Sequence, residues 1–376
     1  MLSARRRSSA DAPWRVGVLF SYTGYMALIE ETQLRGTLLA IDEINGQGGV
    51  NGREILPILY DPASDPASCG RYAKKLMVSD NVTMIFGCYT SSSRKAVLPV
   101  VERLNGLLWY PTIYEGFELS PNVIYTGAAP NQNSVKLCRY LMQNFGNRFF
   151  FIGSDYIYPR ESNRIMREVV RRHGGKVVGE TYLSLRAQRH DFRPVMREVK
   201  DLQPDVIFST VVGDATTYLY QSYADAGFNP KVMPIASLTT TETEISAMGF
   251  DVGEHHVTAA PYFQNLPGDS NEMFVQKYKR RYGDDQPTNM CAEAAYFQMH
   301  IFAKALAATN STDPEILRPM VLGADFEAPQ GRVTINAASH HTDLWTRIGR
   351  ANRGGQFDLV EQSISPVTAD PFLLAS

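Results

Sequence analysis

Short apolar runs alternate with longer amphipathic stretches along the first part of the chain. Residues 16–20 form a continuous apolar run, and residues 31–45 repeat apolar side chains on one helical face. The same alternation predicts further strands at 54–60, 82–87 and 107–110, and helices at about 67–78 and 92–105. Because strands that alternate with helices form parallel sheets covered on both faces, the pattern predicts an α/β lobe with a doubly wound sheet.

The alternation restarts after residue 127 and predicts a second lobe of the same class. It predicts helices at 133–144, 162–173, 192–202 and 216–226, and strands at 148–153, 176–183, 206–212 and 233–237. Two strong helices follow at 270–282 and 291–308, and then a short strand pair around 331–335 and 346–352. We expect the late helices to return to the first lobe. The predicted lobes are 14–130 plus 265–335 and 131–264 plus 336–376, with a flexible tail over 1–13.

Composition narrows the class of protein. A chain of 376 residues is long enough for two domains. The formal net charge of -2 argues against direct nucleic-acid binding, and no apolar run reaches the roughly 18 residues of a membrane helix. The four cysteines show no metal or disulfide spacing. The basic amino-terminal segment lacks the apolar core of a secretory signal, which predicts a cytoplasmic protein. If a signal peptide had been removed from the amino terminus, the protein would instead belong in the periplasm.

Hydroxyl side chains follow two neighbouring strands of the first predicted lobe. Tyr89 and Ser91 follow the strand at 82–87, and Tyr110 and Thr112 end or follow the strand at 107–110. Open α/β sheets bind ligands at the carboxyl ends of their strands. Hydroxyls both donate and accept hydrogen bonds without the cost of burying a charge. These residues therefore predict a site for a small, uncharged, amide-like molecule, although Ser92 and Ser93 could serve only as a helix cap.

The second half offers its own candidates for the same site. Tyr156, like Tyr158, follows a predicted strand and could stack on a planar ligand or pack within its own lobe. Val212, Gly213 and Asp214 end or follow another strand. The Asp214 carboxylate could accept from a ligand NH2 group, but capping the following helix is the favoured interpretation.

Enzyme motifs are weak. Cys88, Lys95 and Glu102 are the residue types of a nitrilase-like amide hydrolase, yet nothing in the pattern orients the last two toward the cysteine. No nucleophile elbow or phosphate-binding loop is present, and the adjacent histidine pairs are poorly spaced for a metal. We therefore expect a protein without catalytic residues, metal or cofactor.

Several long motifs carry a resemblance to a known family. They are RKAVLPVVER (94–103), YPTIYEGFELSPN (110–122), GAAPNQNS (127–134), FIGSDYIYPRESN (151–163), FSTVVG (208–213), IASLTTTETE (235–244), APYF (260–263) and APQG (328–331). The chain resembles the type I periplasmic-binding-protein fold, in the branch that holds the amide receptor regulating aliphatic amidase expression and the urea-binding transporter proteins. The motifs SDYIYPRESN and STVVG look like the amide receptor, whereas TSSSRKAVLPV and SHHT look more like the urea binders.

The resemblance implies two lobes that close on a ligand, with a role for each candidate. Ser91 and Thr112 are similar to the hydroxyl pair that holds the polar head of the ligand, Tyr89 and Tyr110 to its walls, and Tyr156 to the tyrosine that closes from the second lobe. The loop at 212–214 would face the ligand. The favoured implication is an amide sensor that releases an RNA-binding antitermination partner; the alternative is the substrate-binding protein of a urea or short-chain amide ABC transporter. A homodimer is also possible in this fold.

Overall fold

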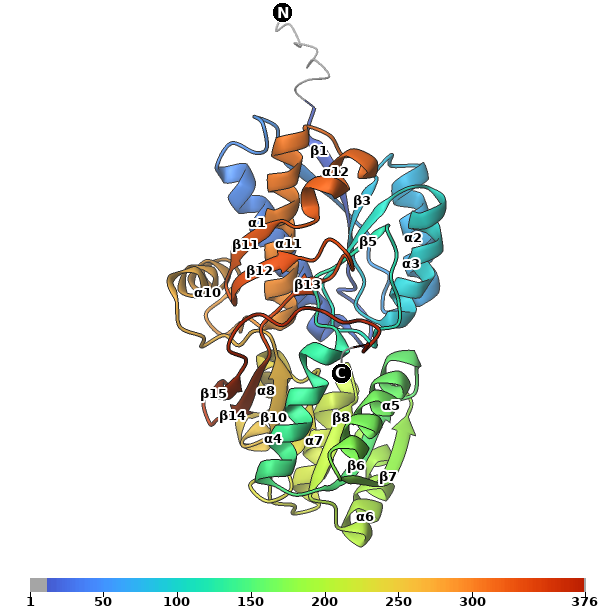
Figure 1. The fold of residues 1–376 in the computed structure, drawn as a ribbon, viewed down its shortest axis with the longest axis vertical. Helices are drawn as coiled ribbons and strands as arrows, with labels where there is room; N and C mark the ends of the chain where they lie inside the picture. Colours follow the sequence, from blue (N-terminus) through green and yellow to red (C-terminus); the bar gives the residue numbers. More distant parts are fainter. Residues whose placement is uncertain (1–11, 375–376) are drawn as a thin grey trace, which may run out of the picture.

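The computed structural model describes residues 12–374 and contains two α/β lobes stacked end to end (Figure 1). The tail predicted over 1–13 lies outside the described residues except for residues 12 and 13. Each lobe is built around one main sheet, and we call the lobe around the amino-terminal sheet the first lobe and the other the second lobe. The predicted fold class is confirmed.

The first lobe contains a five-stranded parallel sheet in the order β2-β1-β3-β4-β5. The strands are β1 (Trp14–Leu19), β2 (Ile55–Leu59), β3 (Met84–Gly87), β4 (Leu107–Tyr110) and β5 (Val123–Tyr125). The connecting helices are α1 (Ala27–Gly46), α2 (Pro66–Val78) and α3 (Ser91–Arg103). β3 and β4 are fully buried, as expected for strands that helices cover on both faces.

The second lobe contains a seven-stranded sheet in the order β15-β14-β10-β9-β8-β6-β7. Its strands are β6 (Arg148–Ser154), β7 (Lys176–Leu183), β8 (Val206–Thr210), β9 (Ile235–Ser237), β10 (Val257–Ala260), β14 (Arg347–Ala351) and β15 (Phe357–Gln362). Its helices are α4 (Ser134–Asn144), α5 (Ile157–Arg172), α6 (Phe192–Leu202), α7 (Asp214–Asp225), α8 (Glu242–Met248) and α9 (Phe250–Gly253). The pairs β10–β14 and β14–β15 are antiparallel, whereas the other pairs are parallel.

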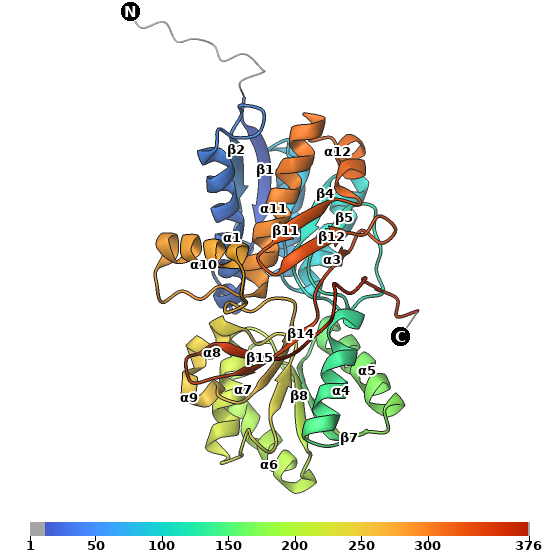
Figure 2. The ribbon, with the colours of Figure 1, turned by 60° about the vertical axis from the view of Figure 1, so that its left-hand side comes forward.

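Late helices pack on the first lobe, the first two beside its first helix and the third beside the second of them (Figures 1 and 2). They are α10 (Asp269–Tyr282), α11 (Met290–Thr309) and α12 (Pro314–Val321). α1 and α11 approach so closely that a Cβ on Gly36 would lie 2.2 Å from the carbonyl oxygen of Ala292. Phe302 of α11 packs edge-on against Phe86 of β3, with ring centroids 5.2 Å apart. The helix is therefore part of the first-lobe core.

The prediction that two strands near the end of the chain pair with each other is wrong. β12 (Gly331–Ile335) pairs with β11 (Asp325–Ala328) and β13 (Thr342–Asp343) in a small third sheet, whereas β14 joins the second-lobe sheet (Figure 2). Both segments are strands, but apolar alternation does not specify a strand's partner. The sequence pattern also places the start of α5 at residue 162, whereas the helix begins at Ile157 because proline is tolerated in a first helical turn.

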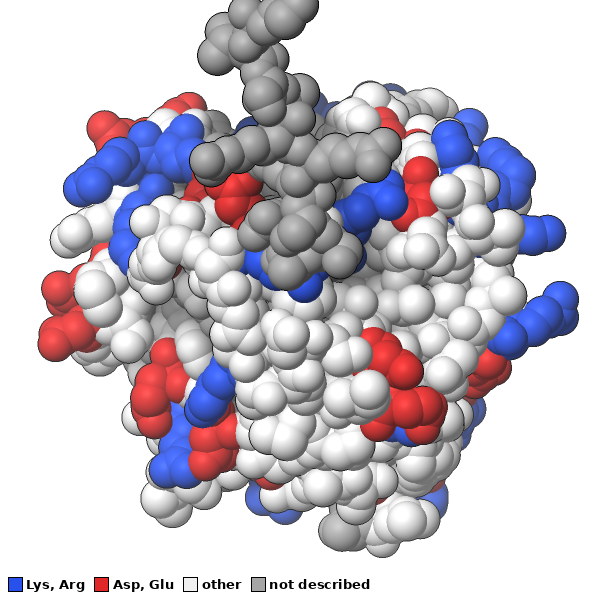
Figure 3. All heavy atoms as spheres, turned by 90° about the horizontal axis from the view of Figure 1, so that it is seen from above, with Lys and Arg blue, Asp and Glu red and all other residues white. Residues whose placement is uncertain are grey.

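The surface has mixed charge on the face shown in Figure 3, where lysine and arginine alternate with acidic residues and broad uncharged areas. Among the described residues, no helix is long and apolar enough to cross a membrane. The four cysteines are buried and form no disulfide.

Candidate functional site

A small hollow lies between the lobes, where the carboxyl ends of five strands converge. The empty space along its lining is about 190 Å³, part of which is open to solvent. Its lining residues follow β3 and β4 of the first lobe and β6, β8 and β9 of the second: Tyr89, Ser91, Thr112, Ile113, Tyr156, Tyr158, Val212 and Thr239. The structure therefore brings five of the eight predicted site residues together, namely Tyr89, Ser91, Thr112, Tyr156 and Val212. Strand ends of parallel sheets are where open α/β folds bind ligands.

Ser91 is held in place by buried charges behind it. It is the first residue of α3, and the preceding Thr90 is the N-cap, accepting from the Ser93 backbone N–H at 3.1 Å. The suggestion that Ser92 and Ser93 cap this helix is therefore wrong. The Ser91 hydroxyl donates to the Glu115 carboxylate and accepts from Arg94 Nη1 at 3.2 Å. Its one proton is thus committed to Glu115.

Arg94 organises this cluster from a fully buried position. Its guanidinium lies 3.0 Å from Glu115 Oε1 and 2.7 Å from Glu118 Oε1. Burial alone would raise the pKa of Glu118, but Arg94, helped by Lys95, holds that pKa below its usual value. The cluster is a charge-paired support placed behind the hollow, since none of these charged side chains lines it.

Thr112 has the same hydrogen-bonding state as Ser91. Its hydroxyl donates to the Cys88 carbonyl oxygen at 3.2 Å and accepts from Gln33 Nε2 at 2.8 Å. The Gln33 amide also donates to the Pro111 carbonyl at 3.2 Å, which fixes its orientation. Because a hydroxyl has one proton and two lone pairs, Ser91 and Thr112 each keep one lone pair and no proton for a ligand.

Tyr110 lies apart from the hollow. Its hydroxyl donates to the Tyr89 carbonyl oxygen at 2.7 Å, and its ring stacks against the guanidinium of Arg94, 4.9 Å from the ring centroid. The structure therefore places Tyr110 in the wall around the buried charges, where it supports the backbone of Tyr89.

Phenol groups face the first-lobe hydroxyls from the second lobe. The rings of Tyr156 and Tyr158 lie 6.2 Å apart, centroid to centroid. The buried Tyr158 hydroxyl makes no hydrogen bond of ordinary geometry with the described residues; burial raises its pKa, and the nearby Ser162 hydroxyl lowers it by less. Burial also raises the pKa of Tyr89 and of Tyr156. All three phenols therefore stay protonated near neutral pH and can donate.

The loop at 212–214 makes a direct contact between the lobes. Val212 lines the hollow, and its N–H donates to Ser154 Oγ at 3.2 Å. Gly213 has a φ of 67°, and a Cβ there would lie 2.5 Å from the Tyr25 carbonyl oxygen of the first lobe. The same carbonyl accepts from the Asp214 N–H at 3.2 Å. Asp214 is exposed and its side chain makes no capping hydrogen bond, so the favoured capping role is wrong.

Comparison with known proteins identifies the family. A family model described as "Periplasmic binding protein domain" matches residues 14–376. This chain belongs to the periplasmic binding protein family. The Leu/Ile/Val-binding protein homolog 6 of Brucella suis is 24% identical to it over 336 residues, which cover 87% of this chain and 84% of that protein.

Other relatives carry the same fold with different ligands in their names. The leucine-, isoleucine-, valine-, threonine- and alanine-binding protein of Pseudomonas aeruginosa is 23% identical over 319 residues, 83% of this chain and 82% of that protein. A solute binding protein of an ABC transporter from Rhodopseudomonas palustris HaA2, solved with p-hydroxybenzoic acid, superposes with a TM-score of 0.87 at 22% identity, covering 97% of this chain and 100% of that one. The chain is thus a ligand-binding protein of this family.

Sequence reasoning missed two residues of this binding protein's hollow. Thr239 follows β9, and its hydroxyl donates to the Val211 carbonyl oxygen at 3.2 Å. The strand-end rule would have found Thr239 if it had been applied to the hydroxyl run after residue 237. Ile113 carries no polar group, so no pattern distinguished it from a core residue. Among the described residues, no group of acidic, histidine and cysteine side chains could hold a metal ion.

Proposed function

We propose that this binding protein is a non-catalytic receptor that closes its lobes on a small neutral molecule bearing an NH2 group next to a carbonyl, either a primary amide or urea. The proposal rests on the hydrogen bonds that the Ser91 and Thr112 hydroxyls already make within the protein. Ser91 and Thr112 have committed their protons to Glu115 and Cys88 and can only accept from a ligand. An NH2 group supplies the two donors that such a pair requires.

The second lobe supplies the complementary groups. The hydroxyls of Tyr156 and Tyr158 keep protons that a ligand carbonyl can accept, because burial raises the pKa of both phenols. A ligand held by acceptors on one lobe and donors on the other makes all its hydrogen bonds only when the lobes are closed. It therefore favours the closed arrangement by differential binding.

Carboxylate ligands fit this hollow poorly. A carboxylate accepts hydrogen bonds, yet the Ser91 and Thr112 hydroxyls offer only lone pairs, and no charged side chain lines the hollow. The relatives named for amino acids or solved with p-hydroxybenzoic acid bind ligands that carry this group. The hollow is narrow, which also favours a small molecule.

The role we favour is delivery of this ligand to an ABC transporter, because the structural relatives include solute binding proteins of such transporters. In this role the protein would work in the periplasm. The motifs SDYIYPRESN and STVVG favour a second candidate, a cytoplasmic amide sensor that regulates amidase expression. A sensor would require an antitermination partner that prefers the open lobes, so that the ligand releases it, and a homodimer is compatible with either role.

Calorimetric titration of the purified chain tests the proposal. We expect formamide, acetamide, propanamide or urea to bind, and leucine and 4-hydroxybenzoate to bind at least tenfold more weakly. Ser91→Ala should weaken the binding of the best ligand, because it removes an acceptor. Tighter binding of leucine or 4-hydroxybenzoate than of every neutral compound would refute the proposal.

A further inference from the structure

A single loop after β4 controls both of the proposed ligand acceptors. We call residues 111–118 the acceptor loop. It carries Thr112 itself, and it carries Glu115, which takes the proton of the Ser91 hydroxyl. Glu115 also lies 3.0 Å from the guanidinium of Arg94, which donates to the same hydroxyl. The hydrogen-bonding state of both acceptors therefore depends on the conformation of this loop.

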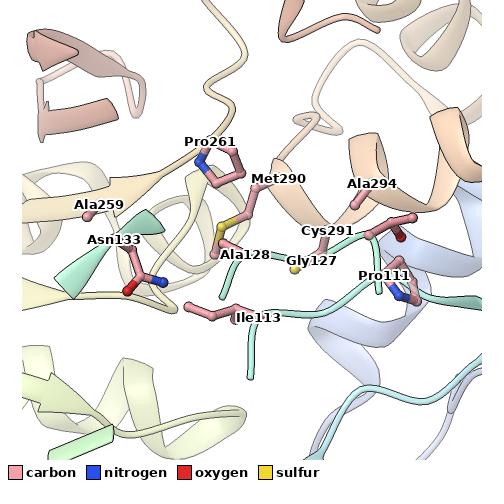
Figure 4. A pocket seen from close by; sticks show the side chains of 11 residues that line it. Pro111, Ile113, Gly127, Ala128, Asn133, Ala259, Pro261, Met290, Cys291 and Ala294 are labelled. Carbon is pink, nitrogen blue, oxygen red and sulfur yellow. The ribbon is translucent and has the colours of Figure 1, made fainter. Parts of the chain in front are cut away.

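The start of the acceptor loop rests against a segment that connects the two lobes. A Cβ on Gly127 would overlap the carbonyl group of Thr112, so only glycine allows this close approach. The Tyr114 N–H donates to the Ala128 carbonyl oxygen at 3.4 Å. Figure 4 shows Ile113 of the loop beside Gly127 and Ala128. These contacts fix the start of the loop but not the turn at its far end.

The far end of the acceptor loop contains a strained turn. Gly116 has a φ of 80° and Phe117 a φ of 57°, so two consecutive residues are left-handed. They separate Glu115 from Glu118, and both carboxylates reach the guanidinium of Arg94. A bulky residue in the left-handed region is uncommon and persists where the surrounding structure holds it. The turn therefore needs support from outside the loop.

A segment near the end of the chain contacts this turn. Residues 367–373, which we call the strap, come after β15 of the second lobe and run along the junction of the lobes (Figure 2). The Phe117 N–H donates to the Pro371 carbonyl oxygen at 2.8 Å, and a Cβ on Gly116 would lie 2.5 Å from the same oxygen. The rings of Phe117 and Phe372 meet edge-on, with centroids 6.5 Å apart. The strap thus supports the strained turn through both backbone and side chain.

The strap is itself anchored to a segment that connects the lobes. Asn131 Nδ2 donates to the Thr368 carbonyl oxygen at 2.8 Å, and Asn131 Oδ1 accepts from the Asp370 N–H at 2.9 Å. Gln132 Nε2 donates to the Val367 carbonyl oxygen at 2.8 Å. One side chain, that of Asn131, therefore makes two of the hydrogen bonds that hold the strap in place.

We propose that the strap is a positioning element of the binding site, which holds the strained turn and so keeps Ser91 and Thr112 in the acceptor state that a ligand NH2 group requires. The inference rests on the proposed function. None of the strap's described residues lines the hollow, so the strap acts through the acceptor loop and not by touching the ligand. Displacing the strap should therefore weaken ligand binding without removing a ligand contact.

The test is calorimetric titration of the full chain and three variants with urea and propanamide. Gly116→Ala places a methyl group against the Pro371 carbonyl oxygen and close to Pro130, and Asn131→Ala removes two hydrogen bonds to the strap. Gly52→Ala is the matched control, because Gly52 has a φ of 78° but a Cβ there would meet nothing within 4 Å. For the ligand that binds, we expect Gly116→Ala to weaken binding about tenfold, Asn131→Ala about threefold and Gly52→Ala not at all.

A double variant separates positioning from general destabilisation. In a Ser91→Ala chain the acceptor that Glu115 positions is already gone, so adding Gly116→Ala should weaken binding by about threefold or less instead of about tenfold. Fully additive losses would show that the strap stabilises the fold without positioning Ser91, and would overturn the inference. The same cycle with Asn131→Ala decides the matter if Gly116→Ala does not fold.

The titrations also separate failure of this inference from failure of the proposed function. If the unchanged chain binds urea or propanamide, and Gly116→Ala and Asn131→Ala bind the same ligand with full affinity, the strap is not a positioning element, while the receptor assignment stands. If the unchanged chain binds neither compound, the proposed function fails, and the inference fails with it.

Discussion

The two sides of the hollow are built in different ways. On the first-lobe side, the hydroxyls of Ser91 and Thr112 are each fixed by two internal hydrogen bonds, and a fully buried Arg94 stands behind them. On the second-lobe side, the Tyr158 hydroxyl makes no hydrogen bond of ordinary geometry with the described residues. One side is preorganised before any ligand arrives, and the other keeps its hydrogen-bonding capacity for the ligand.

This difference suggests an order of events. A ligand that meets preorganised acceptors on the first lobe loses little affinity to reorganisation there. The phenols of the second lobe gain their partner only on closure, so the free energy of those bonds favours the closed state.

The largest effect should come from Arg94→Met, on stability. Removing this cation leaves Glu115 buried with an uncompensated charge and Glu118 with only the partly exposed Lys95, which should lower the free energy of unfolding by about 3–5 kcal/mol. Arg160→Met on the second lobe is the control, because its exposed pair with Asp155 should contribute at most about 1 kcal/mol. Denaturant unfolding measures both, and equal losses would show that the buried cluster has no special role.

Ser91→Ala and Thr112→Val should weaken binding and, because each hydroxyl makes two internal hydrogen bonds, should also lower stability. Each leaves a ligand NH2 hydrogen without its acceptor in a buried site, which should weaken binding by about 1–3 kcal/mol. Ser92→Ala, on the neighbouring half-buried position outside the lining, should leave affinity unchanged. Calorimetry gives the comparison, and a Ser91→Ala protein with full affinity would remove Ser91 from the site.

Tyr156→Phe and Tyr158→Phe should have smaller effects. Each removes one donor to the ligand carbonyl and should weaken binding by about 0.5–1.5 kcal/mol. Stability should hardly change for Tyr158→Phe, since the lost hydroxyl had no well-formed partner. Thermal unfolding with and without ligand separates the two effects. A large loss of stability from Tyr158→Phe would mean that the second-lobe side is as preorganised as the first.

The smallest effect should be that of pH on binding. Burial raises the pKa of Tyr89, Tyr156 and Tyr158 above the ordinary tyrosine value of about 10, so these donors lose their protons only at still higher pH. Amide affinity should therefore be constant between about pH 6 and pH 9. A change of affinity within this window, followed by calorimetry at several pH values, would indicate a titrating group in the site.

The two-lobe fold could be predicted because the alternation of strands and helices is a local property of the sequence. The ends of the strands are local too, so they pointed to several residues that the structure brings to one hollow. Other features depend on contacts between distant residues. Nothing in the pattern near Ser91 pointed to Glu115, 24 residues later, as the acceptor of its proton. Likewise, the pattern found β12 and β14 but could not tell that they belong to different sheets.

The most direct test of the central claim uses a matched pair of ligands, propanamide and propanoate, titrated into the same protein at neutral pH. The two have the same carbon skeleton, but one brings a neutral NH2 group and the other a negatively charged carboxylate oxygen to the Ser91 and Thr112 hydroxyls. We expect propanamide to bind and propanoate to give no measurable heat. Propanoate binding as tight as that of propanamide, or tighter, would show that these hydroxyls do not act as acceptors for a neutral ligand.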